Sequence, residues 1–177
     1  MSNLQTINLA NSSLKIDKPP LFYIVNLRYG AYLYLQAGKD AYRDRIAWIR
    51  QGYREIPEQC FHWELQQLDP VYFLLKNTTK ERGGTLFLIA DVDNHRDHLV
   101  EGYIGDPSDK DDLYIQFSRV AVTYGSSVFH IKSKNECYLK GDDRLVGNDR
   151  EVWGQPFKPN ANDTRFHWLF VPAPDKF

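Results

Sequence analysis

Several residue types and features that mark common classes of protein are scarce or missing in this chain. Its 177 residues include two cysteines and one methionine, and 22 Lys and Arg nearly balance 23 Asp and Glu, for a net charge of −1. The charges are dispersed and form no basic stripe of the kind that neutralises nucleic-acid phosphates, so we expect no nucleic-acid partner. The length and charge fit one soluble domain.

The chain also lacks an apolar run long enough to span a membrane. Residues 1–21 are polar, are interrupted by Pro19-Pro20, and have neither the basic start nor the apolar run of a signal peptide. We therefore expect an N-terminal arm over residues 1–20 and a protein that is cytoplasmic or released without a classical signal peptide. In that setting Cys60 and Cys137 are expected to be buried thiols rather than a disulfide.

Sequence motifs of common enzymes are missing as well. There is no Gly-rich phosphate loop, no G-x-S-x-G and no H-E-x-x-H, and neither cysteine lies in a nucleophile signature. The adjacent carboxylates Asp142 and Asp143 would point to opposite faces of a strand, which is wrong for an acid and a base that share one substrate. Acidic and histidine residues crowd positions 91–98, but without the spacing of a calcium loop a solvated loop is favoured. We predict a non-catalytic protein that holds no metal and no cofactor.

What the chain does contain is aromatic residues, 14% of the total, in a pattern that repeats. Phe61-His62-Trp63 returns as Phe166-His167-Trp168, 105 residues later, and Leu113-Tyr114-Ile115 lies near the midpoint as a degenerate copy. A fixed period of this kind indicates a repeated architecture. By strand alternation, the two histidines of the tripeptides are expected to point outward.

Three further landmarks recur in the same order in each repeat. Helical periodicity is weak, and in residues 40–54, the stretch that most resembles a helix, Gly52 argues against a long one. About twelve strands in three units (about 21–70, 71–125 and 126–177) predict an all-β fold, a β-trefoil over residues 21–177 in which six strands close a barrel and three hairpins cap it. The landmarks are Phe22, Phe73 and Phe129 in first strands, Tyr34-Leu35, Phe87-Leu88 and Tyr138-Leu139 in second strands, and Trp48, Tyr103 and Trp153 in third strands.

Over residues 21–172 the chain resembles the ricin-B-type lectins. The run 23–26, the turn at Gly30 and Tyr34-Leu35 look like the opening of a unit in that family. The Phe-His-Trp tripeptides occupy the place of its closing Gln-x-Trp. The resemblance implies that Trp63 and Trp168 are core residues. It also implies sugar binding through a second-strand Asp, a third-strand aromatic and an Asn near the closing motif.

The chain departs from that sugar-binding set in every unit. The Asp place holds Gln36, Ile89 and Lys140, and the polar place before the closing motif holds Cys60, Asp112 and Arg165. The third-strand aromatics could be stacking faces for a sugar or simply buried residues. Our candidate carbohydrate-binding residues are Trp153, Asp142, Asp143, Asn148 and Gln155 in unit three, Trp48 and Gln36 in unit one, and Tyr103 and Asp91 in unit two.

The favoured function is therefore a carbohydrate-binding lectin whose partners are glycans or glycoconjugates, either a defence lectin or the targeting component of a toxin. Irregular loops at 37–45, 91–98, 106–112 and 157–165 are where binding would lie. Because fold does not entail function, two alternatives stay open. One is a protease inhibitor that acts through loop 40–45 or 106–112, and the other is a protein-interaction trefoil. A homodimer is compatible with the lectin and with both alternatives.

Overall fold

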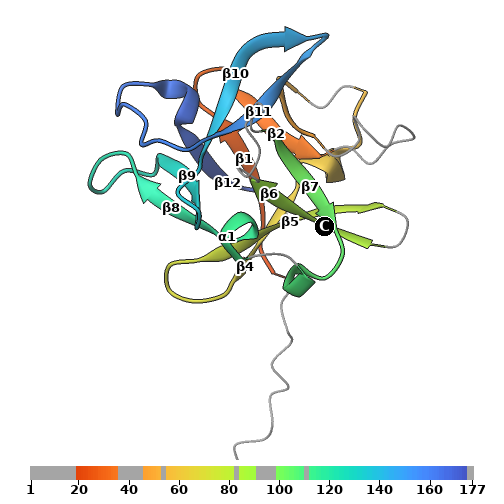
Figure 1. Cartoon of the computed structure of the whole chain (residues 1–177). Coiled ribbons are helices and arrows are strands. Elements are labelled where there is room, and N and C mark those ends of the chain that lie inside the picture. Colours follow the sequence, from red (N-terminus) through yellow and green to blue (C-terminus); the bar gives the residue numbers. More distant parts are fainter. Residues whose placement is uncertain are drawn as a thin grey trace, which may run out of the picture.

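The computed structural model describes residues 19–35, 46–52, 55–81, 84–90, 99–109 and 112–174, and these form one sheet of twelve strands (Figure 1). Among the described residues, no helix is long and apolar enough to cross a membrane. The strands are β1 (Leu21–Asn26), β2 (Ala31–Leu35), β3 (Ala47–Arg50), β4 (Trp63–Gln67), β5 (Phe73–Glu81), β6 (Gly84–Ala90), β7 (Val100–Ile104), β8 (Phe117–Ala121), β9 (Phe129–Ser133), β10 (Tyr138–Val146), β11 (Asp149–Gln155) and β12 (Trp168–Pro172). The helical turns are η1 (Glu58–Phe61), η2 (Pro107–Asp109), α1 (Asp112–Ile115) and η3 (Thr164–Phe166).

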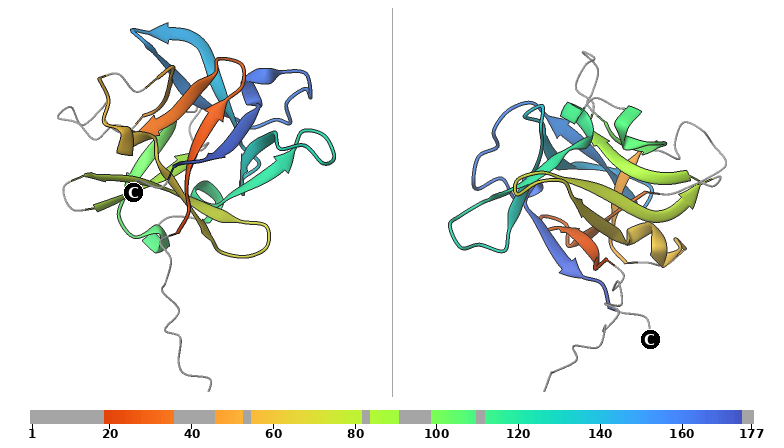
Figure 2. Two further views of the ribbon diagram at one scale, coloured as in Figure 1. Left: turned by 180° about the vertical axis from the view of Figure 1, so that it is seen from behind. Right: turned by 90° about the horizontal axis from the view of Figure 1, so that it is seen from below.

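Six of the strands close a barrel. Each pairs antiparallel with its two neighbours in the ring β1–β4–β5–β8–β9–β12 and back to β1. The other six form the hairpins β2–β3, β6–β7 and β10–β11. In two opposite views the β10–β11 hairpin lies at the far end of the molecule from the β4–β5 loop (Figures 1 and 2). The predicted β-trefoil is confirmed.

The third strands of the three units, β3, β7 and β11, meet in a closed ring that shows the threefold symmetry directly. β3 pairs with β11, and isolated bridges join the starts of β3 and β7 to the next hairpin. No unit could bury its apolar face alone, and this ring is where the three hairpins support one another. The contacts that repeat around it are Ile46 with Glu101, Leu99 with Trp153, and Glu151 with Trp48.

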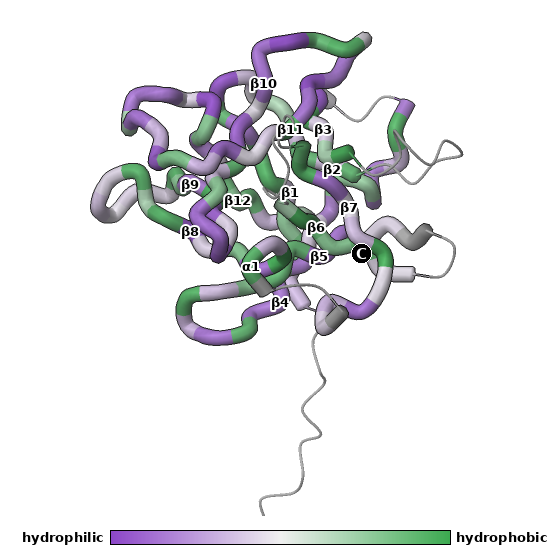
Figure 3. The backbone as a smooth tube through the Cα atoms, viewed as in Figure 1, coloured by the Kyte–Doolittle hydropathy of each residue, from purple (hydrophilic) through white to green (hydrophobic). Residues whose placement is uncertain are grey.

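The core lies inside the barrel and under the hairpins, and both barrel strands such as β1 and hairpin strands such as β6 carry hydrophobic stretches toward it (Figure 3). Trp63 and Trp168 are both fully buried. Their indole N–H groups donate to the carbonyls of Leu33 and Leu139, each at 3.0 Å. A buried indole needs such a partner, and both find it at the same place of their unit. The predicted core role of these tryptophans is confirmed.

The register corrects two sequence landmarks by two residues. Val25, Lys76 and Lys132 occupy the same place in the first strands, and their partners are Tyr32, Phe87 and Tyr138. The second-strand landmark of unit one is therefore Tyr32-Leu33 and not Tyr34-Leu35. In the ring of third strands, the residue equivalent to Trp48 and Trp153 is Glu101, so unit two has no aromatic there and Tyr103 lies two residues later.

The middle copy of the closing tripeptide is also shifted by two residues. Leu113-Tyr114-Ile115 lies in helix α1, not in a strand. The middle residue of each closing tripeptide accepts, at its carbonyl, a hydrogen bond from one backbone N–H group, and the three donors are equivalent. The donor and acceptor pairs are Leu27 with His167, Thr78 with His62, and Lys134 with Gln116. The degenerate copy of the tripeptide is thus Ile115-Gln116-Phe117, whose first and last residues are buried like Phe61 and Trp63.

The expectation that His62 and His167 point outward to solvent is wrong, because both are buried. Strand alternation does turn these side chains away from the barrel interior, but a second layer covers them. In unit one this layer is an apolar cluster of Tyr23, Tyr34, Ile56, Cys60 and Phe61. Alternation places a side chain on a face of the barrel and cannot say whether other segments cover that face.

Other expectations have mixed outcomes. Cys60 and Cys137 are free, buried thiols, as expected, and burial raises both pKa values, that of Cys137 to about 12. The helix-like stretch 40–54 contains strand β3. Residues 1–18, the loops 37–45 and 91–98, Gln36 and Asp91 lie outside the described residues.

Candidate functional site

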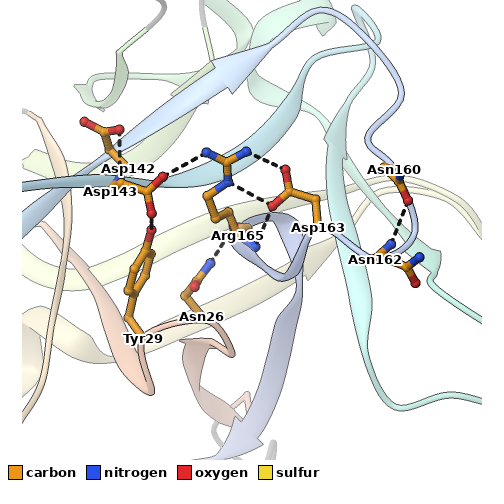
Figure 4. Close-up of polar contacts among 8 residues, drawn as sticks. All are labelled: Asn26, Tyr29, Asp142, Asp143, Asn160, Asn162, Asp163 and Arg165. Atoms are coloured by element: carbon orange, nitrogen blue, oxygen red, sulfur yellow. Dashed lines mark hydrogen bonds and ion pairs between the residues drawn. The ribbon is translucent and has the colours of Figure 1, made fainter.

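A polar cluster centred on Arg165 lies on the outer face of unit three, and we call it the Arg165 cluster. It consists of Tyr29, Asp143, Arg150, Asp163 and Arg165. Three separate segments supply it: the β1–β2 turn, strand β10 with its partner β11, and turn η3 in the β11–β12 connection (Figure 4). The hairpin β10–β11 is among the most hydrophilic parts of the chain (Figure 3).

Local sequence explains how each segment presents its side chain. Gly30 has a φ of +57°, which a glycine adopts without strain, and it closes the turn that carries Tyr29. The β10–β11 register shifts between Gly141 and Leu145, and such an irregularity re-aims side chains, here that of Asp143. Asp163 caps η3 by accepting a hydrogen bond from the backbone N–H of Arg165 at 3.2 Å.

Arg165 holds two carboxylates at once. Its Nε and Nη2 atoms donate to the two oxygens of Asp163 at 2.9 and 2.7 Å, and its Nη1 donates to Asp143 at 2.9 Å. The fork on Asp163 is the bidentate geometry in which arginine pairs most strongly. From the other side, the Tyr29 hydroxyl donates to the second Asp143 oxygen at 2.6 Å (Figure 4). Asp143 is therefore fixed by two donors from distant parts of the chain.

Two further contacts brace the cluster. The guanidinium carbon of Arg150 lies 4.3 Å from the ring centroid of Tyr29, and its Nη1 donates to the backbone carbonyl of Asp143. The buried side chain of Asn26 donates to the backbone carbonyl of Arg165 at 2.8 Å. A site whose groups are held by such supporting contacts keeps its geometry without a ligand.

The charges of the cluster follow from these contacts. The hydrogen bond from Tyr29, and then Arg165, lower the pKa of Asp143. The Arg165 side chain lowers the pKa of Asp163. Burial, and then Asp143, raise the pKa of Tyr29. At neutral pH both carboxylates are therefore ionised acceptors and Tyr29 keeps its proton as a donor.

Beside the cluster lies an open pocket of about 250 Å³. Carboxylate oxygens, guanidinium donors, an amide and a hydroxyl all face it, so it suits a small ligand with several hydroxyl groups. Its lining residues are Arg28, Asp143, Asn162, Asp163, Thr164 and Arg165.

The five candidate carbohydrate-binding residues of unit three do not all lie at one site. Asp143 lines the pocket, and Asp142 lies next to it and accepts a hydrogen bond from the Asp143 backbone N–H at 2.8 Å. Asn148 lines a different pocket of about 410 Å³ at the hairpin tip, together with Arg50 and Glu55. On β11, Trp153 pairs with Lys140 and Gln155 with Tyr138, and neither lines the pocket at the Arg165 cluster.

The three proposed stacking aromatics are all half-buried. Trp48 packs against the outer apolar cluster of unit one, and Tyr103 packs against the corresponding small cluster of unit two. The indole nitrogen of Trp153 is buried and has no hydrogen-bond partner within the part of the chain that the structure describes. None is a freely exposed platform, and none is fully buried.

Sequence reasoning located part of the cluster. Asp143 is a predicted binding residue, and loop 157–165, one of the four loops where binding is expected, holds Asp163 and Arg165. The sequence singled out neither Tyr29 nor Arg150, and Arg165 stood out only as a departure at the polar place before the closing tripeptide. One signal was present, because that polar place holds Arg165 in unit three and Cys60 in unit one. Asp143 is 114 residues from Tyr29 and 22 from Arg165, so their meeting has no local signature.

Comparisons with known proteins support the fold. No protein-family model matches the sequence, and no curated protein matches it. The solved structure of the BEL beta-trefoil is 13% identical, with a TM-score of 0.60 over 87% of this chain and 93% of its own. SeviL bound to asialo-GM1 saccharide is 14% identical, with a TM-score of 0.57 over 89% and 100%. Cytolethal distending toxin from Actinobacillus actinomycetemcomitans is 13% identical, with a TM-score of 0.62 over 89% and 95%.

At these identities the likeness establishes the fold and no more. The chain is a β-trefoil protein, and its structural neighbours are β-trefoil proteins of diverse kinds. Function has to be argued from the site.

Proposed function

We propose that this chain is a non-catalytic carbohydrate-binding β-trefoil, a lectin, whose sugar site is the pocket at the Arg165 cluster. The observation that carries the proposal is Asp143, an ionised carboxylate held by Tyr29 and Arg165 at the edge of a small polar pocket. Such a carboxylate can accept hydrogen bonds from sugar hydroxyls without first losing conformational freedom.

The other lining groups add to this capacity. Arg28 is exposed on the β1–β2 turn, and Asn162 and Thr164 offer neutral donors and acceptors. Because Trp153 does not line the pocket, recognition relies on hydrogen bonds and charge more than on ring stacking. One structural neighbour is described as bound to asialo-GM1 saccharide, which favours a glycan ligand by analogy of fold only.

In this proposal the protein acts by attachment to glycans or glycoconjugates, as a defence lectin or as the targeting component of a toxin. The ricin-B-type resemblance of the sequence supports the same function. We also propose that the protein is located in the cytoplasm or is released without a classical signal peptide.

A glycan array, followed by calorimetric titration of any glycan that binds, tests the proposal. We expect Asp143→Ala to weaken binding at least about tenfold, as loss of a charged hydrogen-bond partner does. Asn148→Ala is the matched control, because it alters the other pocket of the same hairpin, and it should bind like the natural chain. An array on which the natural chain binds nothing at high concentration contradicts the proposal. Loss of binding in Asn148→Ala alone would move the site to the hairpin tip.

A further inference from the structure

Two histidines lie against each other beside η3, the turn that carries Arg165. The side chains of His130 on β9 and His167 after η3 have ring centroids 5.5 Å apart and planes tilted by 31°. Only 5% of His130 and 9% of His167 is exposed. The Nε2 atoms of both rings are buried and have no hydrogen-bond partner among the described residues. Buried polar atoms without partners are rare and call for an explanation.

The other two units fill the same places differently. Unit one has Tyr23 and His62, and the tyrosine hydroxyl lies 3.1 Å from His62 Nε2 and donates to Glu58 at 2.9 Å. Unit two has Leu74 and Gln116. Unit one thus supplies its buried imidazole with a hydroxyl and a nearby carboxylate, whereas unit three supplies only a second imidazole.

The charged surroundings of the pair disfavour a proton. Burial, then His167, then Lys158 lower the pKa of His130. On β9, Lys132 is paired with Glu136, and on β10 Tyr138 packs edge-on against His130. The carboxylate of Asp163, four residues before His167 in the chain, is held by Arg165. In the described part of the chain, neither imidazole forms an ion pair with a carboxylate. A neighbouring lysine also counts against a metal ion at these nitrogens, and no third ligand accompanies them among the described residues.

His167 connects this pair to both walls of the pocket. Its backbone N–H donates to the carbonyl of Thr164 at 3.2 Å, in the wall that carries Arg165. Its carbonyl accepts from the backbone N–H of Leu27 at 2.9 Å, next to Arg28 on the β1–β2 turn, which supplies another wall of the pocket. A displacement of His167 therefore disturbs both sides of the site.

We propose that the His130–His167 pair is an acid-sensitive latch for the pocket at the Arg165 cluster. The neutral pair lies beside η3, which His167 caps, and holds the two walls together. On acidification, a proton on His130 places a cation in a buried position against His167 and beside Lys158, where burial without a partner is costly. His167 then moves toward solvent, the walls separate and the pocket releases its ligand. As a regulation of the sugar site, the latch rests on the proposed function.

The chain provides its own control variants. His130→Tyr rebuilds the tyrosine–histidine pair of unit one. The double variant His130→Leu/His167→Gln rebuilds the pair of unit two and covers the case in which the first variant folds poorly. Nitrogen-15 NMR follows the Arg165 Nε–H and the Leu27 amide from about pH 7.5 to about pH 5.5, the range in which histidine titrates.

In the natural chain we expect both reporters to shift together with the titration of His130, whose midpoint lies below the ordinary value of about 6.5. In both variants the two reporters should stay constant over this range. Reporters that ignore the histidine titration in the natural chain overturn the latch. Zinc ions added alone at about pH 7.5 that perturb both imidazoles would replace it with a metal site.

The test needs no sugar, so its result is separate from that of the glycan array. If the NMR reporters shift with pH but no glycan on the array binds, the latch is supported and the lectin function is contradicted. If the reporters stay constant but a glycan binds, the lectin function is supported and the latch is contradicted.

Discussion

Units one and three build the same outer face from the same backbone and fill it with opposite chemistry. In unit one the place before the closing tripeptide holds Cys60, which is 3% exposed within an apolar cluster. In unit three that place holds Arg165, whose side chain is 33% exposed and organises a polar pocket. Two neighbouring places also change from an aromatic residue of the apolar cluster to a basic residue: Tyr23 of unit one corresponds to His130 of unit three, and Tyr34 corresponds to Lys140.

The backbone beneath these side chains is held by the same kind of hydrogen bond in both units. Asn77 donates to the Cys60 carbonyl at 2.8 Å, and Asn26 donates to the Arg165 carbonyl at the same distance. The scaffold thus supplies three similar faces, and a few side chains decide whether a face becomes an extension of the core or a candidate site. This is why the three units share a fold while only one carries the Arg165 cluster.

The largest effect is expected where the units are alike. Trp63→Ala and Trp168→Ala should each reduce the free energy of unfolding by about 3–5 kcal/mol, because each leaves a large cavity and an unpaired carbonyl. Urea unfolding measures both. Trp63→Phe and Trp168→Phe imitate Phe117 of unit two and should cost less, about 1–3 kcal/mol. A cost for one tryptophan several times that of the other would contradict the equivalence of the units.

The next effect should occur in unit three alone. Arg165→Ala removes the partner of two carboxylates and should destabilise the fold by about 1–2 kcal/mol. The pKa of Asp163 should rise toward its ordinary value, which carbon-13 NMR of the carboxyl group follows. Arg165→Lys keeps the charge but loses the fork, so it should not restore either property. An unchanged Asp163 titration in Arg165→Ala would show that the cap at η3, and not Arg165, holds the carboxylate ionised.

A smaller effect concerns pH and again separates the units. Because the pKa of His130 is lower in the folded chain than in the unfolded chain, the unfolded chain takes up the proton first. The contribution of neutral His130 to the free energy of unfolding is therefore fully present above about pH 6.5, and it is lost as the pH falls below that value. Urea unfolding at two pH values measures the loss, which His130→Tyr should abolish. If His62→Gln in unit one abolishes it instead, the comparison of the two pairs is wrong.

The smallest effect is expected at the far end of the barrel. Leu65, Arg119 and Phe170 occupy the same place in the three units, and the Arg119 guanidinium carbon lies 5.9, 5.3 and 5.4 Å from the rings of Phe73, Phe129 and Phe170. Arg119→Leu copies unit one and should change the stability by less than about 1 kcal/mol. Glycan binding should not change, since this end lies far from the Arg165 cluster. A large loss of stability would mean that the cation is essential to closing the barrel.

The sequence by itself determined the threefold repeat, the β-trefoil, the two core tryptophans and the two buried thiols. It could do so because the core repeats one apolar pattern in every unit, and a closed barrel leaves few other ways to bury that pattern.

Only the tertiary structure decided the register and the site. Tyr34, Tyr103 and Leu113-Tyr114-Ile115 each lie two residues from the true equivalents. Tyr34 and Tyr103 lie in strands, where a slip of two keeps every side chain on its original face, so the apolar pattern cannot detect it. Leu113-Tyr114-Ile115 lies in helix α1, which strand alternation does not describe. The Arg165 cluster was beyond the sequence for a different reason. Asp143 meets Tyr29 and Arg165 only after the barrel closes and brings the first strands beside the last.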